Sequence, residues 1–394
     1  MGGFPAIPGT RLLTEAARRG KIDVIWPIQP VSLMDEFAVS NAVPTLGDVA
    51  NLAGVSKSTA SRILSVAGSA AKKIPYAPET KSKVRAAAAK LGYKPSKLAR
   101  GLSLAKTGII GLVVPSLTDS FFPIVTSAIE THLAGAGYSV ILANTNADSK
   151  TERARVEDLL SWQVDGLIIA PAQETGDAGL FWELWQRKIP FVLIDRTFPE
   201  TPFFSVSTED EIGAGLVVEH LIAAGRRRIV RIGGPLAVST NRLRHAGYTA
   251  ALIRHGILPQ TDYALDAIPS EEGGYQTLDK ILALDPRPDA VFCFSDNVAI
   301  GLMEACSDRG IRVPEDLALV GYADLPQSRL LKVSLTTIQQ PRPLLGWHAA
   351  KMLLSCLEDR GQPEPIRLSV ELMIRESTVG KASLPRIKEE TRYA

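Results

Sequence analysis

The chain is poor in cysteine, in histidine and in long apolar runs, and each shortage excludes a class of protein. Its three cysteines, Cys293, Cys306 and Cys356, are scattered and odd in number. This pattern argues against a disulfide framework and favours a reducing cytoplasm. Neither the cysteines nor the five histidines have metal-ligand spacing, so we expect no metal and no other cofactor. No apolar run approaches the roughly 18 residues of a membrane span.

Net charge is also small, but it is unevenly distributed. The formal charge of the 394 residues is +2, so no global basic field indicates a nucleic-acid partner. Between Lys57 and Lys106, however, there are twelve Lys or Arg residues and a single acid, Glu79. A solvated charged face normally mixes both signs, whereas a local basic segment on a balanced chain is typical of a DNA-binding module.

The basic segment begins with the pattern of two short helices. In TLGDVANLAGVSKSTASR, residues 45–62, apolar residues recur at i, i+3, i+4 and i+7. Thr45 can cap the first helix with Asp48 as its capping-box partner, Gly54 can end it, and Ser56 can cap the second. The pattern indicates a helix-turn-helix, although an ordinary amphipathic hairpin also fits this spacing. The outer face of the second helix offers donors suited to phosphates and base edges: Lys57, Ser58, Thr59, Ser61 and Arg62.

A third helix and a linker follow this pair. Pro78 suits the first position of a helix, because its missing N–H costs nothing there, and Gly92 closes that helix. We therefore expect residues 44–93 to form one DNA-binding domain of three helices. Residues 94–107 are expected to be a short hinge helix that Gly101 weakens by about 1 kcal/mol relative to Ala. Because so short a helix is marginal in water, it should order only when docked.

The two ends of the chain are less informative. Residues 1–43 show no clear period and lack the continuous apolar core of a signal peptide. Two interpretations stay open for them: a true start at Met34, or a disordered arm that touches DNA. Residues 381–394 form a tail without leucine heptads, which favours a dimer over a tail-linked tetramer.

From residue 108 to residue 380, short apolar runs alternate with amphipathic helical stretches. The expected strands are 109–115, 138–145, 165–171, 191–195, 228–235, 290–296 and 317–322. The helices expected between them include 125–137, 150–163, 213–225 and 241–256. Near-continuous apolar strands with helical crossovers predict parallel sheets covered on both faces. The expected fold class is therefore α/β, with two doubly wound lobes behind an all-helical N-terminal domain.

The sheets also predict where a ligand would bind. In open parallel sheets, ligands bind beyond the carboxyl ends of the strands. Those ends here carry carboxylates, an arginine and aromatic rings within 116–122, 144–148, 195–196, 295–296 and 322–324. Carboxylates can accept hydrogen bonds from paired hydroxyls, and a ring can cover the apolar face of a sugar. This composition favours a polyhydroxylated ligand.

The order of these parts resembles the lactose/galactose repressor family of bacterial transcription regulators. The helix-turn-helix phrase, then YKPSKLARGL, then a two-lobed body like a periplasmic binding protein carry the resemblance, which runs from about Pro44 to Gly380. Later phrases in the same order include DSFFP at 119–123, RLRHAGY at 242–248 and VPEDLALVGYAD at 313–324. The resemblance implies a homodimeric repressor that binds a pseudo-palindromic operator and is switched by a small molecule between its lobes.

The resemblance also implies roles for residues that contact DNA. Lys57, Ser58 and Arg62 would read bases, and Arg62 is the expected bidentate partner of a guanine. Phosphates would be held by Thr45, Ser56, Thr59 and Ser61. Leu102 would enter the minor groove as an apolar wedge, unless it is an ordinary linker leucine. The loop at 72–79 is longer than the family pattern; it either adds a phosphate contact through Lys72 or Lys73 or is inert.

In the cleft, the family positions imply effector contacts from Asp119, Phe121, Thr240, Arg244 and Asp296. Asp296 could instead, or in addition, cap a helix that begins near Asn297. Asp195 is interpreted as structural, and Asp324 is not assigned to the ligand because Ala323 replaces its usual acidic neighbour. Val238 stands where purine-binding members carry an arginine. A sugar or sugar acid is therefore favoured over a purine.

Two other classes of protein fit less well. A solute-binding transport protein would need export and has no use for residues 45–104. An enzyme is disfavoured because the chain has no nucleophile elbow and no G-x-G-x-x-G motif. We therefore expect a cytoplasmic regulator that is not an enzyme, is associated with the nucleoid when bound to its operator, and has no membrane partner.

Overall fold

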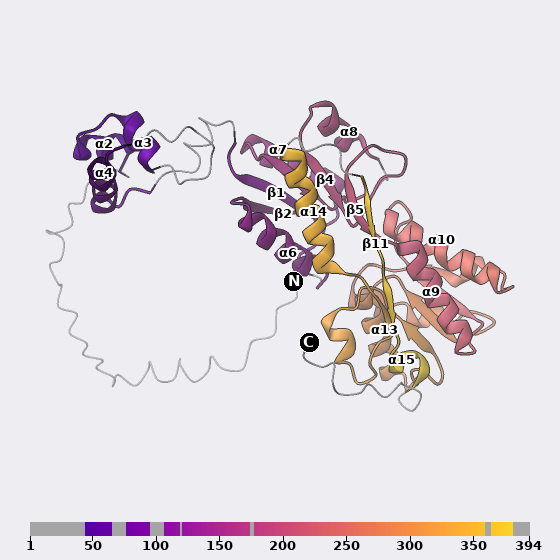
Figure 1. The fold of residues 1–394 in the computed structure, drawn as a ribbon. Helices are drawn as coiled ribbons and strands as arrows, with labels where there is room; N and C mark the ends of the chain where they lie inside the picture. The colour runs from indigo at the N-terminus through magenta and orange to yellow at the C-terminus, as the bar shows by residue number, and fades with distance from the viewer. Residues whose placement is uncertain are drawn as a thin grey trace, which may run out of the picture. The chain divides into compact units, whose positions relative to one another are not determined.

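The computed structural model describes residues 44–64, 76–94, 106–118, 120–173, 177–358 and 364–380 (Figure 1). The chain divides into two compact units, residues 1–95 and residues 96–394, which are described separately below. In the described residues, no helix is long and apolar enough to cross a membrane.

The first unit contains three helices around a small core. They are α2 (Leu46–Ala53), α3 (Lys57–Leu64) and α4 (Pro78–Leu91). The predicted capping box is confirmed: the backbone N–H of Thr45 donates to Asp48 Oδ2 at 2.8 Å, and Thr45 Oγ1 accepts from the backbone N–H of Asp48. Gly54 then ends α2 in the left-handed region with φ 66°. The fully or nearly fully buried residues are Val49, Ala50, Ala60, Val84, Ala87 and Ala88.

The second unit has two lobes, each with a parallel sheet, as the sequence predicts. The N-terminal sheet has the order β11-β5-β4-β3-β1-β2, and all of its pairs are parallel. Its strands are β1 (Ile109–Val114), β2 (Ser139–Asn144), β3 (Gly166–Ile169), β4 (Phe191–Ile194), β5 (Ser205–Thr208) and β11 (Ile366–Leu368). Its helices are α6 (Phe122–Gly135), α7 (Ser149–Ser161), α8 (Gly179–Gln186) and α14 (Arg342–Leu357).

The strand β1 shows why these runs are apolar throughout. Successive side chains of a strand point to opposite faces, and here helices cover both faces. Ile110 and Leu112 pack in the cluster that includes residues of α6 and α14, whereas Val113 packs with residues of α7 and α8. Burial on both sides removes the apolar/polar alternation that a half-exposed strand would show.

The C-terminal lobe repeats this construction with fewer strands. Its parallel sheet has the order β7-β6-β8-β9, and a separate antiparallel pair joins β10 and β12. The strands are β6 (Ile229–Gly233), β7 (Ala264–Asp266), β8 (Ala290–Cys293), β9 (Ala318–Val320), β10 (Thr337–Gln339) and β12 (Glu371–Met373). The helices are α9 (Asp210–Ala223), α10 (Ser239–Arg254), α11 (Glu271–Tyr275), α12 (Leu278–Leu282), α13 (Asp296–Asp308) and α15 (Glu376–Val379), with 3-10 turns η1 (Thr261–Tyr263) and η2 (Pro326–Arg329).

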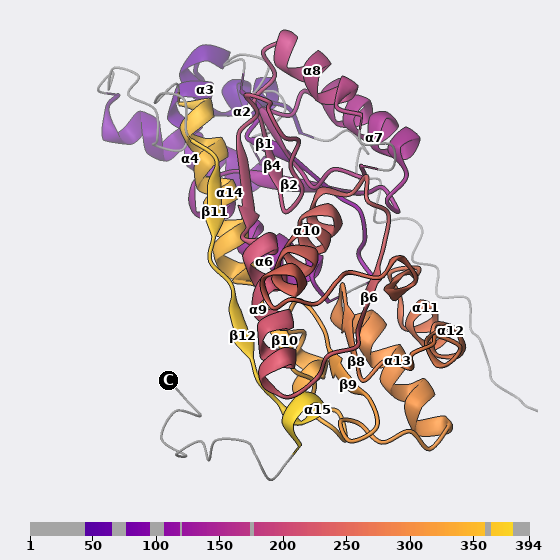
Figure 2. The same cartoon turned by 90° about the vertical axis from the view of Figure 1, so that its right-hand side faces the viewer.

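Three segments of chain pass between the lobes. They are residues 208–210 from β5 to α9, residues 339–342 from β10 to α14, and residues 368–371 from β11 to β12. Figure 2 shows β11 and β12 running on from one another, in yellow, along the side of both lobes. Short parallel connections of this kind can absorb the backbone change of a hinge closure.

One sequence-based alternative for α13 is wrong. We expected that Asp296 could cap a helix beginning near Asn297, but the helix begins at Asp296 and Ser295 is its N-cap. Ser295 Oγ accepts from the backbone N–H of Val298 at 3.4 Å. The backbone N–H of Asp296, which has no partner within the helix, donates to the carbonyl of Tyr322 at 3.0 Å.

Candidate nucleic-acid interface and ligand cleft

The helix α3 buries one face and exposes the other. Ala60 is fully buried against the other two helices, and Ile63 is partly buried beside it. Four side chains on the outer face are exposed: Lys57, Ser58, Ser61 and Arg62. Neither Lys57 nor Arg62 forms an ion pair within the described residues, so both cations are available to an external anion.

The hydroxyl side chains at the start of α3 are already hydrogen-bonded. Ser56 Oγ accepts from the backbone N–H of Thr59 at 3.2 Å, which confirms the predicted cap. The same oxygen lies 2.9 Å from the hydroxyls of both Ser58 and Thr59. Thr45 is likewise occupied by its capping box with Asp48. These hydroxyls hold helix ends in place, which leaves Lys57 and Arg62 as the charged groups of the outer face.

The first unit is strongly basic in its described part. Its acids there are Asp48 and Glu79. The hydrogen bond from the backbone of Thr45 is the main reason why the pKa of Asp48 lies below its usual value, and the charge of Lys57 also contributes. The cations are Lys57, Arg62, Lys81, Lys83, Arg85, Lys90 and Lys94, and all of them are exposed. Such a surface favours a polyanion. Leu102, Lys72 and Lys73 lie outside the described residues.

In the second unit, a clasp of hydrogen bonds joins the lobes at the strand ends. Gln173 follows β3 and is 4% exposed. Its Oε1 accepts from the backbone N–H of Ser239, the first residue of α10, at 2.8 Å, and its Nε2 donates to the carbonyl of Thr197 at 2.7 Å. The backbone N–H of Thr197 donates to Ser239 Oγ at 3.0 Å. The start of α10 is thereby held against two loops of the N-terminal lobe, on the side where ligands bind in such sheets.

Arg244 lies five residues further along α10 than Ser239, in a buried ion pair. Its Nε donates to Asp210 Oδ1 at 2.7 Å, and its Nη1 donates to the carbonyl of Phe294 at 2.5 Å. The guanidinium carbon stands 3.6 Å from the centroid of the Tyr322 ring. No described residue accepts from Nη2. The protein therefore engages two of the three guanidinium nitrogens of Arg244, and Thr240 lies one turn before it on the same helix.

Asp296 is fully buried in this structure. Its Oδ2 accepts from the backbone N–H of Leu325 at 2.7 Å and from Ser328 Oγ at 2.6 Å, and its Oδ1 accepts from Thr337 Oγ1 at 2.5 Å. Burial raises the pKa of this carboxyl above its ordinary value. A direct contact between Asp296 and an effector would require the loop at 322–328 to open. Its effector contact stays a prediction.

Of the remaining predicted effector residues, Phe121 is among the described residues and Asp119 is not. Phe121 is the N-cap residue of α6 in the N-terminal lobe, and its ring meets that of Phe122 edge-on at 5.1 Å. Asp119 lies outside the described residues. Asp324, which we did not assign to the ligand, forms a 2.5 Å ion pair with Arg375 and accepts from Gln339 Nε2 at 3.0 Å.

Several polar residues of the cleft were missed from the sequence. Gln173 and Ser239 of the clasp, and Asp210 as the partner of Arg244, gave no usable local signal, because each acts on a residue more than thirty positions away. Arg231, by contrast, did give a local signal in the sequence. It is a single charge inside the apolar strand RIVRIGG, and the structure places it 3% exposed on β6.

A buried acid beneath the loop after β3 gives a pH-dependent prediction. Glu152 of α7 accepts from the backbone N–H of Ala172 at 2.7 Å, and burial raises its pKa to about 7. A pKa above the unfolded value means that folding disfavours the ionised form, so stability should fall as pH rises from about 4.5 to about 7. In Glu152→Gln this loss should be absent, which leaves the variant more stable than wild type by up to about 3 kcal/mol above pH 7.

Denaturant unfolding between pH 4.5 and pH 8 measures this difference. Glu157→Gln is the matched control, because Glu157 lies on the same helix in an exposed ion pair with Arg187. The control should follow wild type at every pH. Parallel pH profiles for wild type and Glu152→Gln would show that Glu152 titrates normally.

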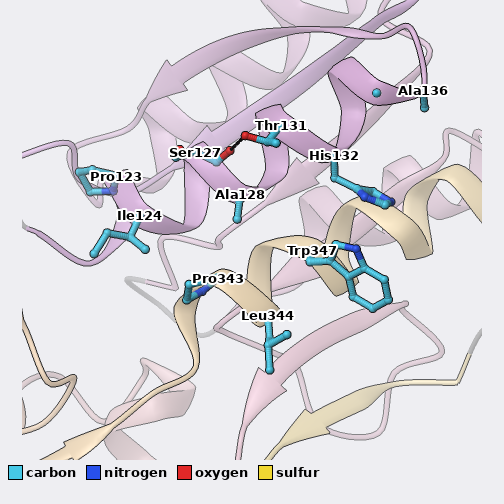
Figure 3. A pocket seen from close by; sticks show the side chains of 11 residues that line it. Pro123, Ile124, Ser127, Ala128, Thr131, His132, Ala136, Pro343, Leu344 and Trp347 are labelled. Atoms are coloured by element: carbon cyan, nitrogen blue, oxygen red, sulfur yellow. Dashed lines mark hydrogen bonds between the residues drawn. The ribbon is translucent and has the colours of Figure 1, made fainter. Parts of the chain in front are cut away.

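A groove of about 1110 Å³ lies elsewhere, between α6 and α14 (Figure 3). Ile124, Leu344 and Trp347 supply apolar walls. Of its two hydroxyl-bearing residues, Thr131 already donates from its Oγ1 to the backbone carbonyl of Ser127 at 2.8 Å. The groove therefore offers little to a polyhydroxylated molecule, in contrast to the polar groups at the strand ends. Within the described residues, no cluster of His, Cys, Asp or Glu could hold a metal ion.

Comparison with known proteins agrees with this division into a DNA-binding unit and a ligand-binding unit. Residues 45–96 match the family described as bacterial regulatory proteins, lacI family, and residues 218–378 match a periplasmic binding protein-like domain. The HTH-type transcriptional repressor PurR of Pasteurella multocida is 32% identical over 335 residues, which cover 84% of this chain and 98% of the relative. The ribose operon repressor of Haemophilus influenzae is 33% identical over 80% of this chain and 92% of its own.

Solved structures give the same result. A lac repressor dimer bound to operator and an anti-inducer has a TM-score of 0.76 and 30% identity, and the match covers 86% of this chain and 100% of the repressor chain. A complex of the regulator CelR with cellobiose has a TM-score of 0.63 and 29% identity over 85% and 99% of the two chains. The chain is thus a DNA-binding transcription regulator and not an enzyme. It belongs to the lacI family of bacterial regulatory proteins.

Proposed function

We propose that this regulator is a repressor that binds a pseudo-palindromic operator as a homodimer and is switched by a sugar or sugar acid. The observation that carries the proposal is the exposed face of α3, where Lys57 and Arg62 lie over a buried core and form no ion pair with any residue that the structure describes. The capped start of α2 and the end at Gly54 fix how that face is presented. The lac repressor dimer on its operator is a relative with the same order of domains.

Within the DNA-binding unit we assign two roles. Lys57, Ser58 and Arg62 read base edges, because long or exposed donors on one helix face can enter the major groove. The hydroxyls at the helix starts and at Ser61 contact phosphates and set the register: Thr45, Ser56, Thr59 and Ser61. Leu102 of the hinge supplies the minor-groove wedge. The regulator works in the cytoplasm and is associated with the nucleoid when bound.

The switch resides in the second unit. The effector enters between the lobes, where Arg244 Nη2 and Thr240 face it from α10, with Phe121 and Asp119 on the N-terminal lobe. Asp296 holds the loop at 322–328 and responds when that loop moves. The three connecting segments absorb the change in lobe angle. A relative in complex with cellobiose supports a sugar as the class of effector.

Salt dependence tests the proposed DNA contact. The full chain should bind its operator with an affinity that falls steeply between about 50 and 200 mM salt, because each phosphate contact releases counterions. Fluorescence anisotropy with operator DNA and with shuffled DNA of equal length measures the slope for each. An affinity that stays flat over this range contradicts the proposed interface.

A further inference from the structure

Arg231 brings a guanidinium to the carboxyl end of the sheet in the C-terminal lobe. It lies on β6, two residues before the strand ends at Gly233, and its side chain curls forward over that glycine. A Cβ added to Gly233 would stand 2.5 Å from the guanidinium carbon, which places the end of the Arg231 side chain directly against this glycine. Arg231 Nη1 donates to Asn241 Oδ1, in the first turn of α10, at 3.1 Å.

This guanidinium has no acidic partner in the described chain. Arg244, which is also buried, pairs with Asp210 at 2.7 Å, and the partly buried Arg375 pairs with Asp324 at 2.5 Å. Buried Arg342, at the start of α14, forms no ion pair within the described residues but donates to the backbone carbonyls of Ser120 and Asp324. Arg231 forms no ion pair within the described residues, and its buried Nε has no hydrogen-bond partner. Burying a cation without a compensating carboxylate costs folding free energy, so such a group is expected to serve a purpose.

Further donors without acceptors surround the same place. Val238, the N-cap of α10, has no side chain that could cap the helix. The backbone N–H of Ser239 is taken by Gln173, but those of Thr240 and Asn241 donate to no described residue. His245, one turn on from Asn241, has a buried Nδ1 without a partner. Burial, followed by the nearby charge of Arg231, lowers the pKa of His245.

One acid does act on this cluster from a distance. Asp266 ends the edge strand β7 as the register partner of Gly233, and it is exposed. Its charge favours the charged form of Arg231 without forming an ion pair with it. The local excess of positive charge and of free N–H donors therefore persists, at a helix N-terminus and at a sheet edge that both suit an anion.

We propose that the effector carries an anionic group, a carboxylate or a phosphate on a polyhydroxylated carbon chain, and that Arg231 and the first turn of α10 bind this group. This rests on the proposed function and narrows its ligand class from sugars in general to acidic sugars. Arg244 Nη2 and Thr240 form hydrogen bonds with the neutral hydroxyls of the same molecule. The bound anion would serve as the ion-pair partner that Arg231 lacks among the described residues.

Ligand-dependent thermal unfolding of the full chain tests the proposal. The probes are D-glucose, D-gluconate, glucose 6-phosphate and inorganic phosphate, each compared with potassium chloride at equal ionic strength. At about ten times its dissociation constant, a bound anion should raise the unfolding midpoint by about 3 °C. Gluconate and glucose 6-phosphate distinguish carboxylate from phosphate, and glucose should give a smaller shift than either.

Three variants tie the response to the site. Arg231→Met should weaken the anionic probes about tenfold to a hundredfold, and Arg231→Lys should retain part of the response because it keeps the charge. Without ligand, Arg231→Met should unfold at the same temperature as wild type or higher, because an unpaired buried charge has been removed. Arg254→Met is the matched control; it removes a charge at the far, exposed end of α10.

The outcomes separate the anion site from the proposed function. A wild-type protein that no anionic probe stabilises beyond chloride overturns the proposal, as does an Arg231→Met variant that folds and keeps the full response. If Arg231→Met does not fold, the folded Arg231→Lys variant decides: a response weaker than that of Arg254→Met supports the site, and an equal response overturns it. Operator binding, measured on the same preparations without ligand, tests the DNA-binding function independently. The DNA-binding function can therefore be supported even if the anion site is disproved.

Discussion

Replacing Arg62 by alanine should lower affinity for the operator by about 5- to 150-fold, which corresponds to the 1–3 kcal/mol of one bidentate contact to a base. Affinity for shuffled DNA should fall by a much smaller factor, because that loss is limited to one charge near the phosphates. The reason is structural. Arg62 is exposed on the outer face of α3, and no carboxylate of the described chain neutralises it.

Arg85→Ala is the control for this measurement. Arg85 is an exposed arginine on α4, outside the recognition face, and has the same charge. It should lower both affinities slightly and equally. Equal losses on operator and shuffled DNA for Arg62→Ala would mean that Arg62 contacts only phosphate, and base reading would then have to be assigned to Lys57 and Ser58.

Replacing Asp210 by alanine should lower the free energy of unfolding of the two-lobed unit by about 3–5 kcal/mol, the cost of leaving a buried charge unpaired. Asp210 is 1% exposed and holds Arg244, which is itself 7% exposed under the ring of Tyr322. Water cannot take over the lost contact. Urea unfolding of the full chain, followed through the transition of this unit, measures the change.

Two further variants show whether the loss comes from the unpaired arginine. Asp210→Ala combined with Arg244→Met should recover most of the stability, because the stranded charge is removed with its partner. Asp279→Ala breaks an ion pair that is exposed on both sides, with Arg309, and should cost less than about 1 kcal/mol. If the double variant is as unstable as the single one, the pair acts by packing and not by charge.

The parts of the fold that depend on neighbouring residues were predictable from the sequence. The box of Thr45 and Asp48, the turn at Gly54 and the helix start at Pro78 depend on contacts within three or four positions, and the structure confirms each. The alternation of apolar strands and helices is equally local. It predicted parallel sheets because strands that are buried on both faces, as in parallel sheets covered by helices, are apolar along their whole length.

The polar interior of the cleft was less predictable, because its contacts join distant parts of the chain. Nothing near Asp210 in the sequence points to Arg244, 34 positions away, and the clasp of Gln173 and Ser239 spans 66 positions. For Asp296, the sequence suggested a capping role as an alternative to an effector contact, but Ser295 is the N-cap of α13. The backbone N–H of Asp296 donates to the carbonyl of Tyr322, a distant contact of which the local sequence gives no sign.

Selection of binding sites from random double-stranded DNA by the full chain is the most direct test of the central claim. The account predicts enrichment of a pseudo-palindromic sequence by the wild-type protein, and loss or relaxation of the same positions in both half-sites with Arg62→Ala. No enrichment over the input pool, or a single asymmetric motif that Arg62→Ala selects equally well, would contradict a dimeric regulator that reads its operator through α3.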